Sequence, residues 1–200
     1  MVTVVIQAGG RSSRMGQDKG LVLLAGRALV EHVLARVDGL GDEVLITTNN
    51  PAGYAYLGVP LAGDAAPGAG ALPGLQTALQ AAHGDHVLVV ACDMPFLNRP
   101  LLTHLLSLAP GVDVVVPQWA DRYQTLHAVY ARRPCLAAVT QALAAGEKRL
   151  ISFYPQVQVR AVTAAEVAEF DPAGRTFFNV NTPDDLAEAR RHFDDARPTP

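Results

Sequence analysis

The sequence lacks the features that mark zinc-binding and membrane-spanning proteins. It has only two cysteines, Cys92 and Cys135, which lie far apart without CxxC spacing or a histidine cluster, so a zinc site is not expected and both thiols should be reduced and buried. No run approaches the ~18 apolar residues that a membrane-spanning helix needs, and no basic segment with a long apolar stretch stands at the N-terminus. We therefore expect a soluble cytoplasmic protein with no membrane partner.

An excess of cations is also missing, since 16 Lys and Arg stand against 19 Asp and Glu, for a net charge of −3. Binding to a nucleic-acid backbone needs a clustered excess of Lys and Arg, so a nucleic-acid partner is not expected and any basic site must be local. Half of the residues are hydrophobic and 18% are charged, as in a globular α/β enzyme. We expect one domain over residues 1–195 and a frayed tail over residues 196–200.

What the sequence does contain is a series of short runs rich in Val and Ile. They are continuously apolar, which is typical of strands covered on both faces, and patterns of helical spacing lie between them. This alternation predicts a single-domain, Rossmann-like α/β fold with a mostly parallel, doubly wound sheet and helices on both faces. The expected strands are residues 2–6, 43–47, 86–91, 113–117, 126–131 and 157–162, and the helical patterns lie at 29–37, at 101–106 and from Pro183 onward, with Thr182 as the cap.

The first expected strand leads directly into the glycine-rich stretch QAGGRSSRMGQDKG, residues 7–20. Ligands of such folds bind at the carboxyl ends of the strands. Gly9 and Gly10 allow the backbone to approach a phosphate closely, and Arg11, Arg14 and Lys19 would stabilise its charge. We interpret the stretch as a phosphate cradle, although glycine content alone is equally compatible with a solvated surface loop. A second glycine-rich segment, residues 63–74, is expected to be a mobile loop beside the site.

Two common phosphate-binding motifs do not fit this stretch. A P-loop needs Ser or Thr directly after its lysine, but Gly20 follows Lys19. A dinucleotide fingerprint needs GxGxxG, and the spacing of the glycines here does not match it. The stretch therefore indicates a different class of nucleotide site.

Asp93 ends the apolar run HVLVVAC, and Pro95 turns the chain out of the sheet. A buried, unpaired carboxylate is unfavourable, and a bound metal would satisfy it. Magnesium prefers one or two carboxylates together with phosphate oxygens and water. The alternative is an aspartate that caps the turn after the strand.

The segment RMGQDK within residues 7–20 resembles the signature of nucleotidyltransferases that activate small phosphorylated substrates. Within that superfamily, the chain is most similar to the molybdenum cofactor guanylyltransferases. Further matching stretches follow in the family's order over nearly the whole chain. They are Asp64 ahead of LPGL, CDMPF at 92–96, GEKRLISFY at 146–154 and FFNVNTPDDL at 177–186.

The resemblance implies that the terminal phosphate of molybdopterin attacks the α-phosphate of GTP and releases pyrophosphate, with Mg²⁺ as cofactor. It also implies transient contact with proteins of molybdenum cofactor biosynthesis or with acceptor proteins. The implied nucleotide-binding residues are Gln7, Ala8, Gly9, Gly10, Lys19, Asp64 and Asp93, with Asp64 accepting from N1 and N2 of guanine. The implied acceptor-binding residues are Arg14, Asn179 and Asn181, the catalytic residues are Lys19, Asp93 and Arg14, and the metal ligand is Asp93.

The chain departs from the family at Gln7, where Leu is usual, and Thr47 or Asn49 stands near the family's base-contacting Asn. His127 and Trp119 have two interpretations each, either a role at the pterin or packing.

Lys148 and Arg149 are either a solvated face or a contact to the pterin or its phosphate. His32, His83, His86 and His104 are expected to serve surface or packing roles.

Two alternative functions stay open. One is a related cytidylyl- or sugar-phosphate nucleotidyltransferase, although cytidylyl relatives tend to carry Ala where Gly9 stands. The other is a non-catalytic nucleotide-binding protein, against which the joint presence of Lys19 and Asp93 argues.

Overall fold

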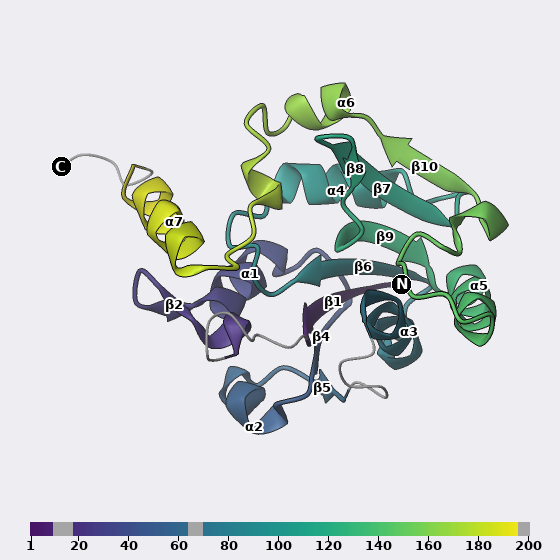
Figure 1. Ribbon diagram of the computed structural model, residues 1–200, viewed down its shortest axis with the longest axis horizontal. Coiled ribbons are helices and arrows are strands. Elements are labelled where there is room, and N and C mark those ends of the chain that lie inside the picture. The colour runs from purple at the N-terminus through teal and green to yellow at the C-terminus, as the bar shows by residue number, and fades with distance from the viewer. Residues whose placement is uncertain (10–17, 64–69, 196–200) are drawn as a thin grey trace.

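A mixed, mostly parallel sheet with helices on both faces forms the centre of the molecule, in a computed structural model that describes residues 1–9, 18–63 and 70–195 (Figure 1). The strand order is β10-β7-β9-β6-β1-β4-β5, and β8 pairs with β7. The predicted α/β architecture is confirmed. β9 runs antiparallel to both of its neighbours, β6 and β7, whereas the other pairs along the main path are parallel. The strands are β1 Val2–Ala8, β4 Glu43–Thr48, β5 Leu61–Ala62, β6 His86–Ala91, β7 Val114–Trp119, β8 Arg122–Tyr123, β9 His127–Ala131 and β10 Val159–Val162.

The two faces of the sheet bury two separate apolar clusters. Val4 and Ile6 of β1 pack in the cluster with α1, α4 and α6, while Val5, which points to the opposite face, packs with α3 and α5. Burial of both faces explains why the strand sequences are continuously apolar. The α-helices that precede the C-terminal helix are α1 Leu29–Val37, α2 Pro51–Tyr54, α3 Ala71–Ala81, α4 Arg99–Ser107, α5 Arg132–Ala144 and α6 Ala164–Ala168. The short 3₁₀ helices are η1 Lys19–Leu21, η2 Ala55–Leu57, η3 Tyr154–Gln156 and η4 Arg175–Phe177.

The C-terminal helix α7 (Pro183–Asp195) lies apart from the main layers, beside the small hairpin of β2 (Leu23–Leu24) and β3 (Arg27–Ala28) (Figure 1). A third apolar cluster joins them, with Leu24 of β2 and Ala189 of α7 fully buried. The predicted cap is confirmed, because the Thr182 hydroxyl accepts a hydrogen bond from the Asp185 amide at 3.1 Å. This docking holds the chain ahead of α7 against the end of the sheet.

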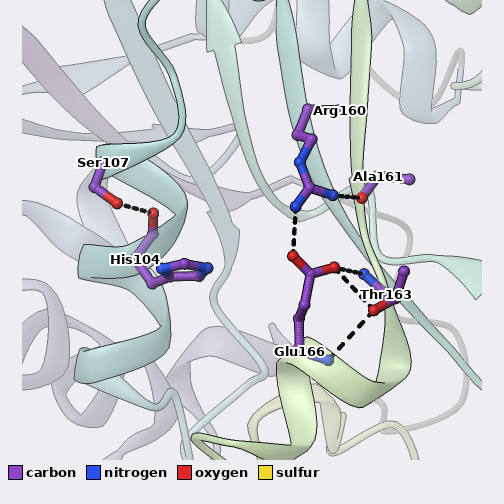
Figure 2. Close-up of polar contacts among 6 residues, drawn as sticks. All are labelled: His104, Ser107, Arg160, Ala161, Thr163 and Glu166. Carbon is purple, nitrogen blue, oxygen red and sulfur yellow. Dashed lines mark hydrogen bonds and ion pairs between the residues drawn. The ribbon is translucent and has the colours of Figure 1, made fainter.

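A capping box connects β10 to α6 (Figure 2). The Thr163 hydroxyl accepts from the Glu166 amide at 3.3 Å, and the Glu166 carboxylate accepts from the Thr163 amide at 2.8 Å. Glu166 also pairs with Arg160, and these hydrogen bonds lower its pKa to about 2. The same view shows Ser107 donating to the carbonyl of His104 in the last turn of α4.

The glycine-rich segment 63–74 is only partly a loop, so that prediction is wrong for its last residues. Helix α3 already begins at Ala71, and Leu72 and Leu75 in its first turns are fully buried against the sheet. Pro73 is tolerated there because amides of the first helical turn need no partner within the helix. Residues 64–69 lie outside the described part of the chain.

Both cysteines are free and buried, as predicted. In the described part of the chain, no helix combines the length and the apolar character required to cross a bilayer. The division into a domain over residues 1–195 and a tail stays a prediction.

Candidate active site

A cavity of about 310 Å³ lies where β1 and β6 end. These two strands are adjacent and parallel, with Gln7 in register with Ala91, so their carboxyl ends open at the same edge of the sheet. The Cys92 amide donates to the Gln7 carbonyl at 3.0 Å and continues the pairing beyond β6. The lining residues are Gln7, Ala8, Gly9, Asp18, Lys19, Ala91, Cys92, Asp93, Leu126, Asn179 and Asn181.

Asp93 and Lys19 meet in this cavity. The ammonium of Lys19 lies 3.6 Å from Oδ2 of Asp93 and donates to Oδ1 of Asn181 at 2.5 Å. Burial raises the pKa of the Asp93 carboxyl, and the charge of Lys19 opposes that rise. Oδ1 of Asp93 is buried and has no hydrogen-bond partner among the described residues. The carboxylate therefore offers one unused oxygen to a ligand.

The position of Lys19 depends on a polar cluster behind η1. Oδ1 of Asp18 accepts from the Tyr54 hydroxyl at 2.5 Å and from the Gly20 amide at 3.2 Å, and Oδ2 accepts from Nδ2 of Asn50 at 3.4 Å. A Cβ on Gly20 would lie 2.3 Å from the Tyr54 hydroxyl oxygen, so only glycine fits beside this ring. The cluster ties the lysine segment to α2, which follows β4.

The asparagine segment is held against the end of β6. The Val180 amide donates to the Asp93 carbonyl at 2.9 Å, which places Asn179 and Asn181 at the rim. Oδ2 of Asp185 accepts from the Asn181 amide at 2.9 Å. Burial acts to raise the pKa of Asp185, but its hydrogen bonds with Asn181 and Thr182 outweigh this effect, and the pKa lies below its ordinary value. The first turn of α7 therefore positions the residue that Lys19 contacts.

A single carboxylate with a buried, unused oxygen fits Mg²⁺ that arrives with phosphate oxygens and water as its remaining ligands. It does not fit a metal held by protein alone, because the described residues contain no group of three or more His, Cys, Asp and Glu side chains that could hold an ion.

Most of the predicted site residues that the structure describes converge on this one cavity. Gln7, Ala8, Gly9, Lys19, Asp93, Asn179 and Asn181 all line it. Gly10, Arg11, Arg14 and Asp64 lie outside the described residues, so their placement stays a prediction. The roles of all these residues in binding and catalysis are predictions as well.

Sequence reasoning assigned no role to the residues that hold Lys19 and Asn181. Asp18 stood within the RMGQDK segment and Asp185 within FFNVNTPDDL, so the matched stretches carried a signal for both. Tyr54 and Asn50 had none, because their link to Asp18 bridges 36 and 32 residues of sequence.

His127 does not line the cavity, and its surroundings agree with the packing alternative. The side chain is 0% exposed, packs edge-on against Phe177 with ring centres 4.9 Å apart, and lies 3.5 Å from the Thr176 hydroxyl. Burial lowers the pKa of His127 to about 3. Trp119 packs against Phe177 and Gly174, in agreement with the packing alternative.

Thr47 is buried beside Gln7 in the neighbouring strand, whereas Asn49 is exposed and lies 3.8 Å from the position a Cβ would take on Gly9. Lys148 and Arg149 are exposed and lie outside the cavity lining. Their interpretation as a solvated face is the one that this placement favours.

The chain belongs to the MobA-like NTP transferase family, whose domain model matches residues 4–161. It is therefore a nucleotidyltransferase, as predicted.

Relatives that cover nearly the whole chain carry a more specific name. A protein of Pelotomaculum thermopropionicum, named probable molybdenum cofactor guanylyltransferase, is 37% identical over 195 residues, which are 98% of this chain and 95% of that one. The molybdenum cofactor guanylyltransferase of Desulfosudis oleivorans is 32% identical over 190 residues, or 94% of each chain. The predicted resemblance to this group is confirmed.

Solved structures agree with the fold. The crystal structure of molybdopterin-guanine dinucleotide biosynthesis protein A from Archaeoglobus fulgidus has a TM-score of 0.82 at 27% identity and covers 98% of this chain and 100% of that one. The 4-diphosphocytidyl-2C-methyl-D-erythritol synthase of Anaerococcus prevotii has a TM-score of 0.75 at 14% identity over 97% of this chain and 96% of that one, and it shows the common fold alone.

Proposed function

We propose that this chain transfers GMP from GTP to the terminal phosphate of molybdopterin and releases pyrophosphate. The observation that carries the proposal is the Lys19–Asp93 pair, which lies beside Ala8 and Gly9 at the carboxyl end of β1. Similarity over nearly the full length to proteins named molybdenum cofactor guanylyltransferase supports the choice of GTP and a molybdopterin-type acceptor.

The chain itself contributes charge and position in this reaction. Lys19 reaches the cavity from η1, where its ammonium stabilises the negative charge that develops on the transferred phosphoryl group. The backbone around Ala8 and Gly9 brings amides close to the phosphates. The attacking phosphate is already an anion, so neither a protein base nor a covalent enzyme intermediate is required.

Asp93 would hold Mg²⁺ through the oxygen that has no partner among the described residues. The chemistry that Mg²⁺ supplies at such a site is neutralisation of charge on phosphate oxygens. Lys19 contacts Asp93 on one side and Asn181 on the other, so it lies between the proposed nucleotide and acceptor sides. This arrangement fits an in-line transfer between two bound phosphates.

Mixing the pure protein with molybdopterin, GTP and Mg²⁺ tests the proposal directly. The expected result is pyrophosphate release together with the guanine dinucleotide product, observed by mass spectrometry. A panel with CTP and sugar phosphates distinguishes the related nucleotidyltransferases. A preference for CTP, or binding of GTP without any product, contradicts the assignment. The expected contacts with proteins of molybdenum cofactor biosynthesis or with acceptor proteins stay a prediction.

A further inference from the structure

Gln7 lines the cavity at a position where the chain departs from the family, since Leu is usual there. It lies near the end of β1 and its side chain is only partly exposed. Its amide nitrogen Nε2 is buried and has no hydrogen-bond partner in the described part of the chain. A buried donor without an acceptor is unfavourable, so a polar side chain is retained there more readily if a ligand accepts from it.

The side chain of Gln7 lies on the α3 side of the cavity. It points to the same face of the sheet as Val5, which packs in the cluster with α3 and α5. A Cβ on Gly74, in the first turns of α3, would lie 3.7 Å from both Nε2 and Oε1 of Gln7. The carboxamide therefore sits between the end of β1 and the start of α3.

The charged groups of the cavity are anchored on the other face. Tyr54, whose hydroxyl holds the lysine segment, and Cys92, which precedes Asp93, both pack in the opposite cluster with α1 and α4. The negatively charged phosphates of a nucleotide would therefore lie on that side, near the ammonium of Lys19. The neutral carboxamide on the α3 side matches an uncharged hydrogen-bonding group, and the nucleotide's base has such groups.

We propose that Gln7 is a specificity-determining residue that donates a hydrogen bond from Nε2 to the carbonyl oxygen O6 of guanine. Among the hydrogen-bond acceptors of guanine, the exocyclic O6 is the one that distinguishes it from adenine-type bases, which carry an amino donor at that position. A donor fixed opposite position 6 accepts guanine and leaves a 6-amino base with two donors facing each other. This inference rests on the proposed use of GTP.

The test compares GTP with 2,6-diaminopurine riboside triphosphate, which keeps the 2-amino group, replaces O6 by an amino group and has an acceptor in place of the N1 hydrogen. Wild-type protein is expected to bind GTP at least tenfold more tightly than this analogue. Gln7→Glu replaces the donor by an acceptor, so the ratio of the two Kd values should fall by about tenfold or more. Gln7→Leu removes both groups and should give an intermediate ratio.

Gln76→Leu is the matched control, because it makes the same chemical change on α3 at a side chain that bonds to Thr140 instead of lining the cavity. Its ratio should equal that of the wild type. An unchanged ratio in both folded Gln7 variants, or an equal loss for both nucleotides, overturns the inference. If the variants do not fold, equal affinity of the wild type for GTP and the analogue overturns it.

The same measurements separate this inference from the proposed function. GMP transfer to molybdopterin with an unchanged ratio in the Gln7 variants overturns the inference alone. A ratio that shifts as expected in a protein that makes no dinucleotide overturns the proposed function and supports the contact between Gln7 and the base.

Discussion

Asp93 combines burial with a cation on only one of its two carboxylate oxygens. The side chain is 12% exposed, and Lys19 is 3.6 Å from Oδ2 while Oδ1 has no partner among the described residues. An arrangement of this kind reduces stability in the free protein, because an incompletely paired buried charge is unfavourable. Such a penalty is typical of a group kept for ligand binding.

Asp93→Asn should lower the rate of GMP transfer by roughly 100-fold or more, because the amide cannot replace a carboxylate at the metal. The free energy of unfolding should not fall, since the substitution removes a buried charge. Steady-state pyrophosphate release and thermal unfolding measure the two quantities. Glu147→Gln, at an exposed carboxylate after α5, is the control and should change neither. Normal turnover in Asp93→Asn contradicts the metal role.

His127 should make folding stability depend on pH. Burial lowers its pKa to about 3, so the unfolded chain binds a proton below about pH 6.5 that the folded protein does not bind. Well above pH 6.5 the histidine is neutral in both states and does not affect the free energy of unfolding. As the pH falls from about 6.5 toward 3, protonation of His127 in the unfolded chain lowers the free energy of unfolding. Between pH 7 and pH 5 the stability lost in this way amounts to about 2 kcal/mol. Denaturant unfolding of the wild type and of His127→Leu at both pH values measures this loss. If the free energy of unfolding changes equally with pH in both proteins, His127 is not the group responsible.

At the scale of elements, the cavity depends on segments that are short and far apart in sequence. η1 carries Lys19, α2 carries Tyr54, and the start of α7 carries Asp185, which accepts from the Asn181 amide. The hydrogen bonds that join Tyr54 to Asp18, Lys19 to Asn181 and Asn181 to Asp185 each connect two different segments or an element with the loop beside it. These bonds join the elements in the arrangement that brings Lys19, Asp93 and Asn181 together.

Tyr54→Phe should slow transfer by about tenfold and lower the free energy of unfolding by about 1–2 kcal/mol, because Asp18 loses its hydroxyl partner and Lys19 loses a fixed position. Thr163→Ala is a matched control. It removes the cap of α6, about 1 kcal/mol of stability, at a site outside the cavity lining. Kinetics and denaturant unfolding of both variants test the prediction. A similar rate loss in both would show that instability alone slows the enzyme.

For the whole molecule, three apolar clusters join the elements around the sheet. Two of them cover opposite faces, and the third docks α7 on the β2–β3 hairpin (Figure 1). The cavity opens where β1 and β6 end, between segments that belong to different clusters. A ligand bound there should therefore stabilise the folded protein as a unit.

GTP with Mg²⁺ should therefore raise the free energy of unfolding by about 2.7 kcal/mol at a ligand concentration 100 times Kd. Chelation of Mg²⁺ should reduce the effect, since Asp93 then faces the phosphates without a metal. Thermal unfolding with GTP, with GTP and EDTA, and with CTP measures this. Stabilisation by CTP equal to that by GTP is the result that argues against a guanine site.

The sequence by itself determined the alternation of strands and helices and the place of the site after β1. Continuous apolar runs require burial on both faces, and parallel strands bring Gln7 and Asp93 to the same edge. The resemblance of FFNVNTPDDL to a stretch of the family also pointed to Asn179 and Asn181 as site residues, and both line the cavity.

Only the tertiary structure decided which side chains meet. The antiparallel direction of β9, the burial of His127 and the hydroxyl of Tyr54 behind Lys19 all depend on contacts between segments distant in sequence. Periodicity and composition report the surroundings of a residue on its own element, whereas these partners come from other elements. Gln7 is a further example. The comparison with the family marked it as unusual, but only its surroundings beside α3 in the structure showed that its amide nitrogen is buried at the cavity.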